Sequence, residues 1–233
     1  MKTFVLNGWA ASPAAWDLCA FARDRVWSYV EQLDGLPARA LAASDGAVLV
    51  GWSMGGAGAL KLALEQPGKI RGLVLVAATA RMMEAKDEGW AGMSPRRLKA
   101  LELGLKATHG EGFFGVPEGK PNPYATDTDE NLRRGLDFLR ETDLRAALLD
   151  VFSPAAPRRA VFPVYVFQSV RDGIVRPGNA DFLRRVFPQA VVETVPGGEH
   201  ALPIWIPEKI DAAVAACRAE GAGTRSLCSN IRQ

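Results

Sequence analysis

The chain has 233 residues, and its 28 Lys and Arg side chains nearly balance 26 Asp and Glu, which leaves a net charge of +2. This length fits one domain with room for an insertion, and so small a net charge argues against a nucleic-acid-binding protein. Three cysteines, an odd number without a C-x-x-C spacing, argue against a disulfide framework and a structural zinc site.

The N-terminus has a short apolar stretch that reaches Asn7-Gly8 after only three apolar residues. A secretory signal needs a longer apolar region, and no run along the chain approaches the length of a membrane span. We therefore expect a cytoplasmic protein without membrane contacts.

Short apolar runs alternate with longer helical patterns, which is typical of a parallel sheet flanked by helices. The runs show little alternation between apolar and polar residues, so the strands are expected to be buried on both faces. The sequence therefore predicts an α/β fold with a mostly parallel central sheet. The expected strands are Thr3 to Leu6, Val48 to Gly51, Gly72 to Val76, Val164 to Gln168 and Val191 to Val195, with a further strand near Trp27 to Val30.

The pentapeptide Gly51-Trp52-Ser53-Met54-Gly55 links one of these strands to a helix-like stretch at residues 56–64. A serine on such a tight turn projects its hydroxyl from the sheet, and the flanking glycines prevent backbone collisions. A phosphate-binding loop is the alternative, but it needs a lysine followed by Ser or Thr at its end, and Lys61 comes too late, six residues after Gly55. The pattern favours Ser53 as a nucleophile.

Residues 82–143 contain no good strand and many charges, and they predict an inserted helical cap. Leucines at helical spacing indicate helices at Pro95 to Lys106 and Asp129 to Arg140. The predicted organisation is a core of residues 1–81 and 144–219, the cap between them, and a flexible tail at residues 220–233.

An activated serine needs a general base and a carboxylate that orients this base. The chain has two histidines, and His200 follows the last predicted strand, whereas His109 lies inside the cap. Asp172 follows the preceding strand and gives the order serine, acid, histidine, which is typical of triads on parallel sheets. Glu199 is the competing acid, but it adjoins the histidine and cannot easily reach the ring nitrogen of its neighbour.

Ester hydrolysis also needs donors for the oxyanion of the tetrahedral intermediate, each of which can lower the barrier by roughly 3 kcal/mol. The backbone N–H of Met54 is the first candidate. The second is the N–H of Trp9, because Gly8 lets the loop after the first strand turn that N–H inward.

These features resemble the α/β-hydrolase superfamily and, within it, the BioH-type pimeloyl-[acyl-carrier protein] methyl ester carboxylesterases of biotin synthesis. The resemblance spans most of residues 4–212. In that family a histidine usually stands at the position of Asn7, and the spacing from Trp9 to Ser53 is short here. The segments that carry the resemblance are Asn7-Gly8-Trp9, residues 51–56, residues 75–79 and 87–93, residues 135–145 and Asp172-Gly173-Ile174-Val175.

The resemblance implies that Ser53, His200 and Asp172 hydrolyse the methyl ester of pimeloyl-acyl-carrier protein without a metal or organic cofactor. The acidic carrier protein would be the partner of a monomeric enzyme and would dock outside the cap. The acyl chain would lie beneath the cap, along Trp9, Trp90, Met93, Phe113 and Phe114.

Two basic groups in the cap, Arg96-Arg97-Lys99 and Arg133-Arg134, could form the docking patch or could be solvated helix faces. Residues 81–150 contain 11 Lys and Arg against 13 Asp and Glu, so the cap is not basic as a whole. A general short-chain carboxylesterase is therefore the main alternative. A C–C bond hydrolase, a cofactor-free haloperoxidase and a ligand-binding receptor on the same fold also stay open.

Overall fold

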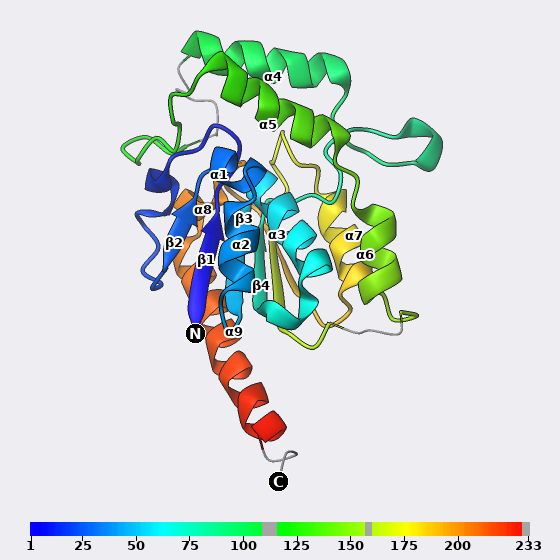
Figure 1. Cartoon of the computed structure of the whole chain (residues 1–233). Coiled ribbons are helices and arrows are strands. Elements are labelled where there is room, and N and C mark those ends of the chain that lie inside the picture. Colours follow the sequence, from blue (N-terminus) through cyan, green and yellow to red (C-terminus); the bar gives the residue numbers. More distant parts are fainter. Residues whose placement is uncertain (109–115, 157–159, 230–233) are drawn as a thin grey trace.

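The computed structural model describes residues 1–108, 116–156 and 160–229. Within these ranges, one parallel sheet of six strands has the order β2-β1-β3-β4-β5-β6 (Figure 1). The predicted α/β fold with a parallel sheet is thus confirmed, as are five of the predicted strands. The strands are β1 (Lys2–Leu6), β2 (Arg25–Trp27), β3 (Ala47–Trp52), β4 (Ile70–Val76), β5 (Val164–Ser169) and β6 (Val191–Val195).

The strand predicted near Trp27 to Val30 was wrong in its position. The strand ends at Trp27, and helix α1 (Tyr29–Leu33) begins two residues later. Ser28 and Glu31 form a capping box, in which each side chain bonds the backbone N–H of the other residue. This local helix-start signal outweighs the β preference of the aromatic and branched residues around it.

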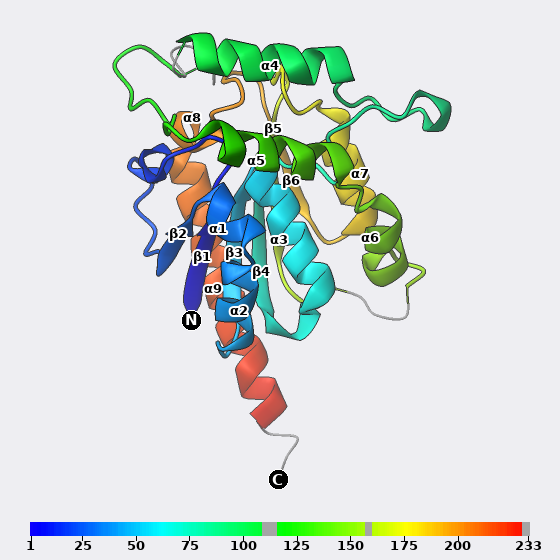
Figure 2. The same ribbon diagram turned by 45° about the horizontal axis from the view of Figure 1, so that its top comes forward.

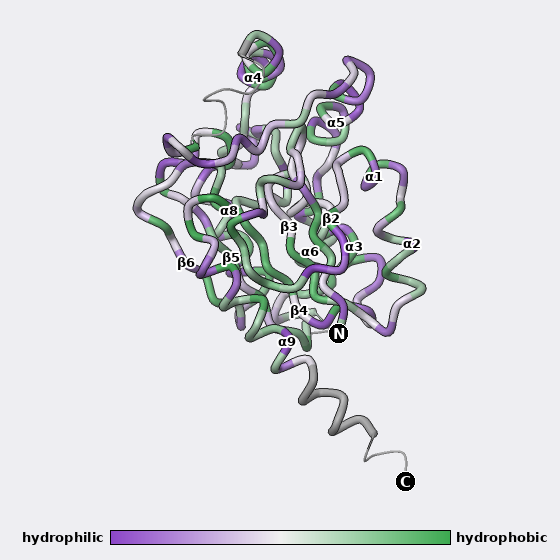
Figure 3. The backbone as a smooth tube through the Cα atoms, turned by 90° about the vertical axis from the view of Figure 1, so that its left-hand side faces the viewer, coloured by the Kyte–Doolittle hydropathy of each residue, from purple (hydrophilic) through white to green (hydrophobic). Residues whose placement is uncertain are grey.

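Helices cover both faces of the sheet. In the central strand β3, Val48 and Val50 pack into a core shared with α9, whereas Leu49 packs into a second core with α3. Figure 3 shows apolar residues following the central strands through the interior. The helices outside the cap are α1, α2 (Leu36–Ala42), α3 (Met54–Glu65), α6 (Arg145–Phe152), α7 (Gly178–Val186), α8 (Leu202–Trp205) and α9 (Pro207–Ser229), with 3₁₀ turns at Pro13–Trp16, Pro67–Lys69 and Lys86–Glu88.

Two helices between β4 and β5 lie across the carboxyl end of the sheet. They are α4 (Pro95–Thr108) and α5 (Asp129–Glu141), which begin at the predicted residues and end one or two residues later. In Figure 1 α4 lies above α5, and the side view in Figure 3 shows the two helices beside each other, with α5 on the side of α1. This placement agrees with a cap, whose limits at residues 82 and 143 stay a prediction.

The C-terminal helix α9 continues through Ser229, and residues 230–233 lie outside the described residues. The flexible tail at residues 220–233 stays a prediction. Among the helices that the structure describes, none combines the length and the apolar composition that a membrane crossing requires.

Candidate active site

Ser53 occupies a strained turn between β3 and α3. Its backbone angles are φ 58° and ψ −120°, a conformation that non-glycine residues rarely adopt. The flanking glycines allow this turn, because a Cβ at Gly55 would lie 2.0 Å from the carbonyl oxygen of Leu6, and a Cβ at Gly51 would lie 2.5 Å from that of Gly55. The turn thus holds the serine hydroxyl at the carboxyl end of the sheet.

The structure brings the three predicted triad residues together. His200 Nε2 lies 2.8 Å from Ser53 Oγ, and His200 Nδ1 lies 2.9 Å from Asp172 Oδ2. All three residues are buried, with 6% or less of their surface exposed. This hydrogen-bonded line from carboxylate to hydroxyl has the geometry of a nucleophile with its general base and an orienting acid.

Backbone donors fix the carboxylate of Asp172. Its Oδ1 accepts the N–H groups of Ile174 and Val175 at 2.8 and 2.9 Å, which leaves Oδ2 directed at the imidazole. The buried Gln168 amide also lies 3.3 Å from Oδ2. A carboxylate only accepts hydrogen bonds, so these donors all match it.

Two further side chains hold the loop that carries His200. The indole N–H of Trp52 donates to the backbone carbonyl of His200 at 2.8 Å, and the Ser169 hydroxyl donates to the carbonyl of Gly198 at 2.6 Å. Sequence reasoning missed Gln168 and Ser169. The sequence offered one signal for them, since both are polar residues that end an apolar strand a few positions before the predicted acid.

Met54 and Trp9 both lie beside Ser53. Met54 is the first residue of α3, so its N–H has no acceptor within the helix. Trp9 lies in a turn in which the N–H of Ala11 donates to the carbonyl of Gly8 at 3.3 Å, and Ala10 has a positive φ of 54°. The assignment of these two N–H groups to the oxyanion stays a prediction.

Asn7 holds this turn in place of the histidine that is usual in the family it resembles. The side chain is fully buried, and its Nδ2 donates to the carbonyls of Ala11 and Ser12 at 3.0 and 2.8 Å. Its Oδ1 accepts the indole N–H of Trp16 at 3.1 Å. The Asn7 amide thus ties the turn at Ala11 and Ser12 to the side chain of Trp16.

A small cavity of about 20 Å³ adjoins the serine, which is close to the space that one water molecule needs. None of the described residues that line it is Lys or Arg. Trp9 and Met93 both line the cavity, whereas Phe113 and Phe114 lie outside the described residues, and the substrate contacts of all four stay a prediction. The lining residues are Trp9, Ser53, Met82, Met93, Leu98, Leu101, Leu139, Ile174 and His200.

Trp90 was predicted to contact substrate, but it is not among the residues that line the cavity beside Ser53. Its ring packs edge-on against Phe182 of α7 at 5.5 Å, and the Arg145 guanidinium lies over it at 5.0 Å. Its indole N–H donates to the carbonyl of Arg81 at 3.1 Å. These contacts turn the side chain toward α6 and α7 and away from the cavity.

Replacing Trp90 with alanine is therefore expected to lower stability and to spare catalysis. Loss of this partly buried ring should reduce the free energy of unfolding by about 2 kcal/mol. The kcat/KM for a short nitrophenyl ester should stay within about twofold of the native value. Urea unfolding and ester hydrolysis on the same samples check both expectations, and a tenfold fall in kcat/KM with unchanged stability would contradict this placement.

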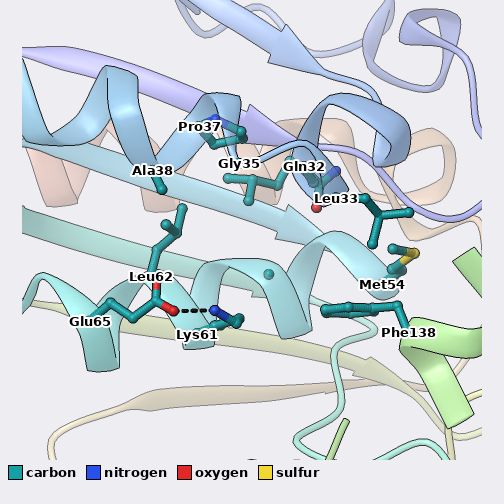
Figure 4. Close-up of a pocket in the computed structure, with 12 residues that line it drawn as sticks. Gln32, Leu33, Gly35, Pro37, Ala38, Met54, Lys61, Leu62, Glu65 and Phe138 are labelled. Carbon is teal, nitrogen blue, oxygen red and sulfur yellow. Dashed lines mark hydrogen bonds and ion pairs between the residues drawn. The ribbon is translucent and has the colours of Figure 1, made fainter. Parts of the chain in front are cut away.

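A wider groove of about 220 Å³ lies on the outer side of α3, where Gln32, Leu62 and Phe138 contribute to its walls (Figure 4). Lys61 and Glu65 form an ion pair on its wall. It contains no triad residue, although Met54 adjoins it. Within the described part of the chain, no group of three or more His, Cys, Asp or Glu side chains is placed to hold a metal ion.

A family model described as the alpha/beta hydrolase fold matches residues 7–207. The pimeloyl-[acyl-carrier protein] methyl ester esterase of Chromobacterium violaceum is 30% identical over 203 residues, which cover 84% of this chain and 74% of that protein. The esterase of the same name from Shewanella woodyi is 31% identical over 46% of this chain, and the match spans about half of that protein, 49% of its length.

Solved structures of hydrolases share the same arrangement of strands and helices. An esterase from Exiguobacterium antarcticum superposes with a TM-score of 0.71 over 94% of this chain and 92% of that chain. Its sequence identity is 16%, so this likeness concerns the fold alone.

Proposed function

The chain belongs to the α/β-hydrolase family, in the group that contains the pimeloyl-[acyl-carrier protein] methyl ester esterases, and from that premise we propose that it is a serine carboxylesterase of biotin synthesis. Its substrate is the methyl ester of pimeloyl-acyl-carrier protein. The observation that carries the proposal is the buried line Asp172, His200, Ser53, with contacts of 2.9 and 2.8 Å. The relatives, which are pimeloyl-[acyl-carrier protein] methyl ester esterases, supply the substrate.

The reaction proceeds through an acyl-enzyme. Ser53 Oγ attacks the ester carbonyl while His200 Nε2 takes its proton, and Asp172 keeps the imidazole in the orientation for this transfer. The N–H groups of Met54 and Trp9 donate to the oxyanion. His200 then returns the proton to the leaving methoxide, which departs as methanol. Water attacks the acyl-enzyme in the same way, and the products are the free carboxylate and the regenerated serine.

The lining of the cavity suits a neutral ester. Apolar side chains such as Met82, Met93 and Leu101 surround the serine, and none of the described lining residues is a cation that would pair with a carboxylate. Such a lining costs a neutral ester little desolvation, whereas a free carboxylate would lose its hydration without a partner. This difference favours release of the carboxylate product.

The carrier protein is proposed to dock on the cap helices, outside the cavity. Arg96 and Arg133 are exposed on α4 and α5, which cross the end of the sheet that carries Ser53 (Figure 2). Arg134 instead pairs with Asp34 of the core at 2.6 Å, and Arg97 donates to the carbonyl of Gly173 at 2.6 Å. The proposal includes a monomer in the cytoplasm, with no cofactor and no nucleic-acid or membrane partner.

Charge reversal at Arg96 and Arg133 tests this docking surface. The double change to glutamate is expected to lower kcat/KM for the carrier-linked ester by about tenfold at low salt, because it removes attraction to an acidic protein. Hydrolysis of a nitrophenyl ester should not change. Arg184→Glu on α7 is the control, and the loss should shrink as ionic strength rises. An equal loss on both substrates would exclude this surface as a docking site.

Methanol release from pimeloyl-acyl-carrier-protein methyl ester tests the proposed function. We expect turnover of this ester to exceed that of nitrophenyl acetate in kcat/KM and to weaken with salt. Turnover of nitrophenyl acetate alone would identify a general short-chain carboxylesterase, the alternative favoured by the small cavity and the balanced charge of the cap. Absence of activity on either ester would leave the C–C bond hydrolase, haloperoxidase and receptor alternatives.

A further inference from the structure

We infer that the cap segment at residues 123–135, here called the brace, positions the oxyanion loop, which comprises residues 7–12. The inference rests on the proposed serine-hydrolase function, because it concerns the N–H of Trp9 in that site. It gives helix α5 and the stretch before it a part in catalysis that is separate from covering the substrate.

The brace pairs with the oxyanion loop through the backbone. The N–H of Ser12 donates to the carbonyl of Pro123 at 2.7 Å, and the N–H of Ala125 donates to the carbonyl of Ala10 at 2.9 Å. Together they form an antiparallel bridge between Ala11 and Tyr124. The loop therefore has hydrogen-bond partners more than 100 residues away along the chain.

Helix α5 also contacts the side chain of Trp9, through a hydrogen bond and through close packing. The indole N–H donates to the carbonyl of Leu132 at 3.0 Å in a buried contact. One turn further on, a Cβ at Gly135 would lie 2.4 Å from Trp9 Cδ1 and 2.9 Å from Nε1. Since real Cβ atoms do not approach this closely, only glycine at this position lets the helix rest on the indole.

The conformation of the loop needs such support. Ala10 has a φ of 54°, in the left-handed region that disfavours residues with a Cβ. The bond from Ala125 to the carbonyl of Ala10 fixes the peptide that follows this strained residue. Without it, the turn can relax and move the N–H of Trp9 away from the oxyanion.

The brace is itself anchored to the core. The hydroxyl of Tyr29 in α1 donates to Asp127 Oδ2 at 2.6 Å, and Asp127 Oδ1 accepts the N–H of Thr128, the N-cap of α5, at 2.7 Å. On the other side of the loop, the Gln32 amide donates to the carbonyl of Asn7 at 2.9 Å, next to the groove in Figure 4. The loop is thus held between α1 and α5.

The first test replaces Gly135 with alanine, with Gly104→Ala in α4 as the matched control. Among the described residues, a Cβ at Gly104 would meet nothing within 4 Å, so that change adds the same methyl group without a collision with them. If the brace positions the loop, kcat of Gly135→Ala for nitrophenyl acetate should fall by about 10- to 100-fold, which is the loss expected when an oxyanion donor is displaced. KM should stay within about twofold, and the control should match the native enzyme.

An unchanged kcat in folded Gly135→Ala, or a loss seen only in KM, would overturn the inference. Tyr29→Phe provides a milder variant in case Gly135→Ala does not fold, since it removes only the hydroxyl that anchors Asp127. It is expected to lower kcat several-fold, and an unchanged kcat would count against the brace in the same way.

Amide hydrogen exchange separates this inference from the proposed function. In Gly135→Ala and Tyr29→Phe, the amides of residues 8–12 should exchange at least about tenfold faster than in the native protein and in Gly104→Ala. Faster exchange in a protein that hydrolyses no ester would support the brace and reject the esterase. Unchanged exchange in an active esterase would reject the brace alone.

Discussion

Replacing Ser53 with alanine is expected to reduce kcat for ester hydrolysis by about 10⁶-fold, because it removes the only atom in the triad that can form the acyl-enzyme. A factor of this size corresponds to about 8 kcal/mol of transition-state stabilisation. The fold should persist, since alanine keeps the Cβ and the strained turn is held by the close packing of Gly51 and Gly55. Hydrolysis of nitrophenyl acetate by purified protein measures the loss.

Ser44→Ala is the matched control for this experiment. Ser44 is also a buried serine, and its hydroxyl donates to the carbonyl of Leu41 at 2.8 Å, away from the triad. This variant should lose some stability and keep the native kcat. Activity of Ser53→Ala within about tenfold of the native enzyme would mean that another group performs the chemistry.

Replacing Asp172 with asparagine is expected to lower kcat by about 10⁴-fold, because it stabilises the wrong tautomer of the His200 imidazole. The N–H groups of Ile174 and Val175 require an acceptor at the Oδ1 position, so the amide oxygen must stay there. The NH₂ group then faces His200 Nδ1 at the position of Oδ2 and donates to it. The ring proton moves to Nε2, which can no longer accept the proton of Ser53.

Glu199→Gln is the control for the acid, because Glu199 is the neighbouring carboxylate and its side chain is exposed. It should leave kcat within about twofold of the native value. A large loss in Glu199→Gln together with an active Asp172→Asn would reverse the assignment. Both variants should fold, since each exchanges groups of nearly the same shape.

The arrangement of Ser53, His200 and Asp172 could be predicted from the sequence because it depends on local context. Ser53 follows a buried strand and precedes a helix, and the order with Asp172 and His200 places all three at the carboxyl ends of parallel strands. The apolar runs of the central strands and the leucine spacing of α4 and α5 were equally local signals. These are the parts of the fold in which short-range pattern and tertiary structure agree.

Long-range contacts could not be predicted in this way. Trp90 lies in the cap sequence beside Met93, but the partners that turn it away, Phe182 and Arg145, come from distant helices. Likewise, Trp9 and Leu132 are 123 residues apart in the chain, so no local sequence pattern predicts their hydrogen bond. The misplaced strand near Trp27 has a different cause, since the local capping box of Ser28 and Glu31 outweighs the β propensity of the residues around it.

The most direct measurement of the central claim is the site of covalent modification by an alkyl phosphonate ester, located by mass spectrometry of peptides from the inactivated protein. Such a reagent reacts with a serine that a neighbouring base activates, and its adduct occupies the place of the tetrahedral intermediate. We expect one adduct per chain, on Ser53, formed also in Glu199→Gln and strongly slowed in Asp172→Asn. An adduct on another residue, or no adduct in a folded native protein, would contradict it.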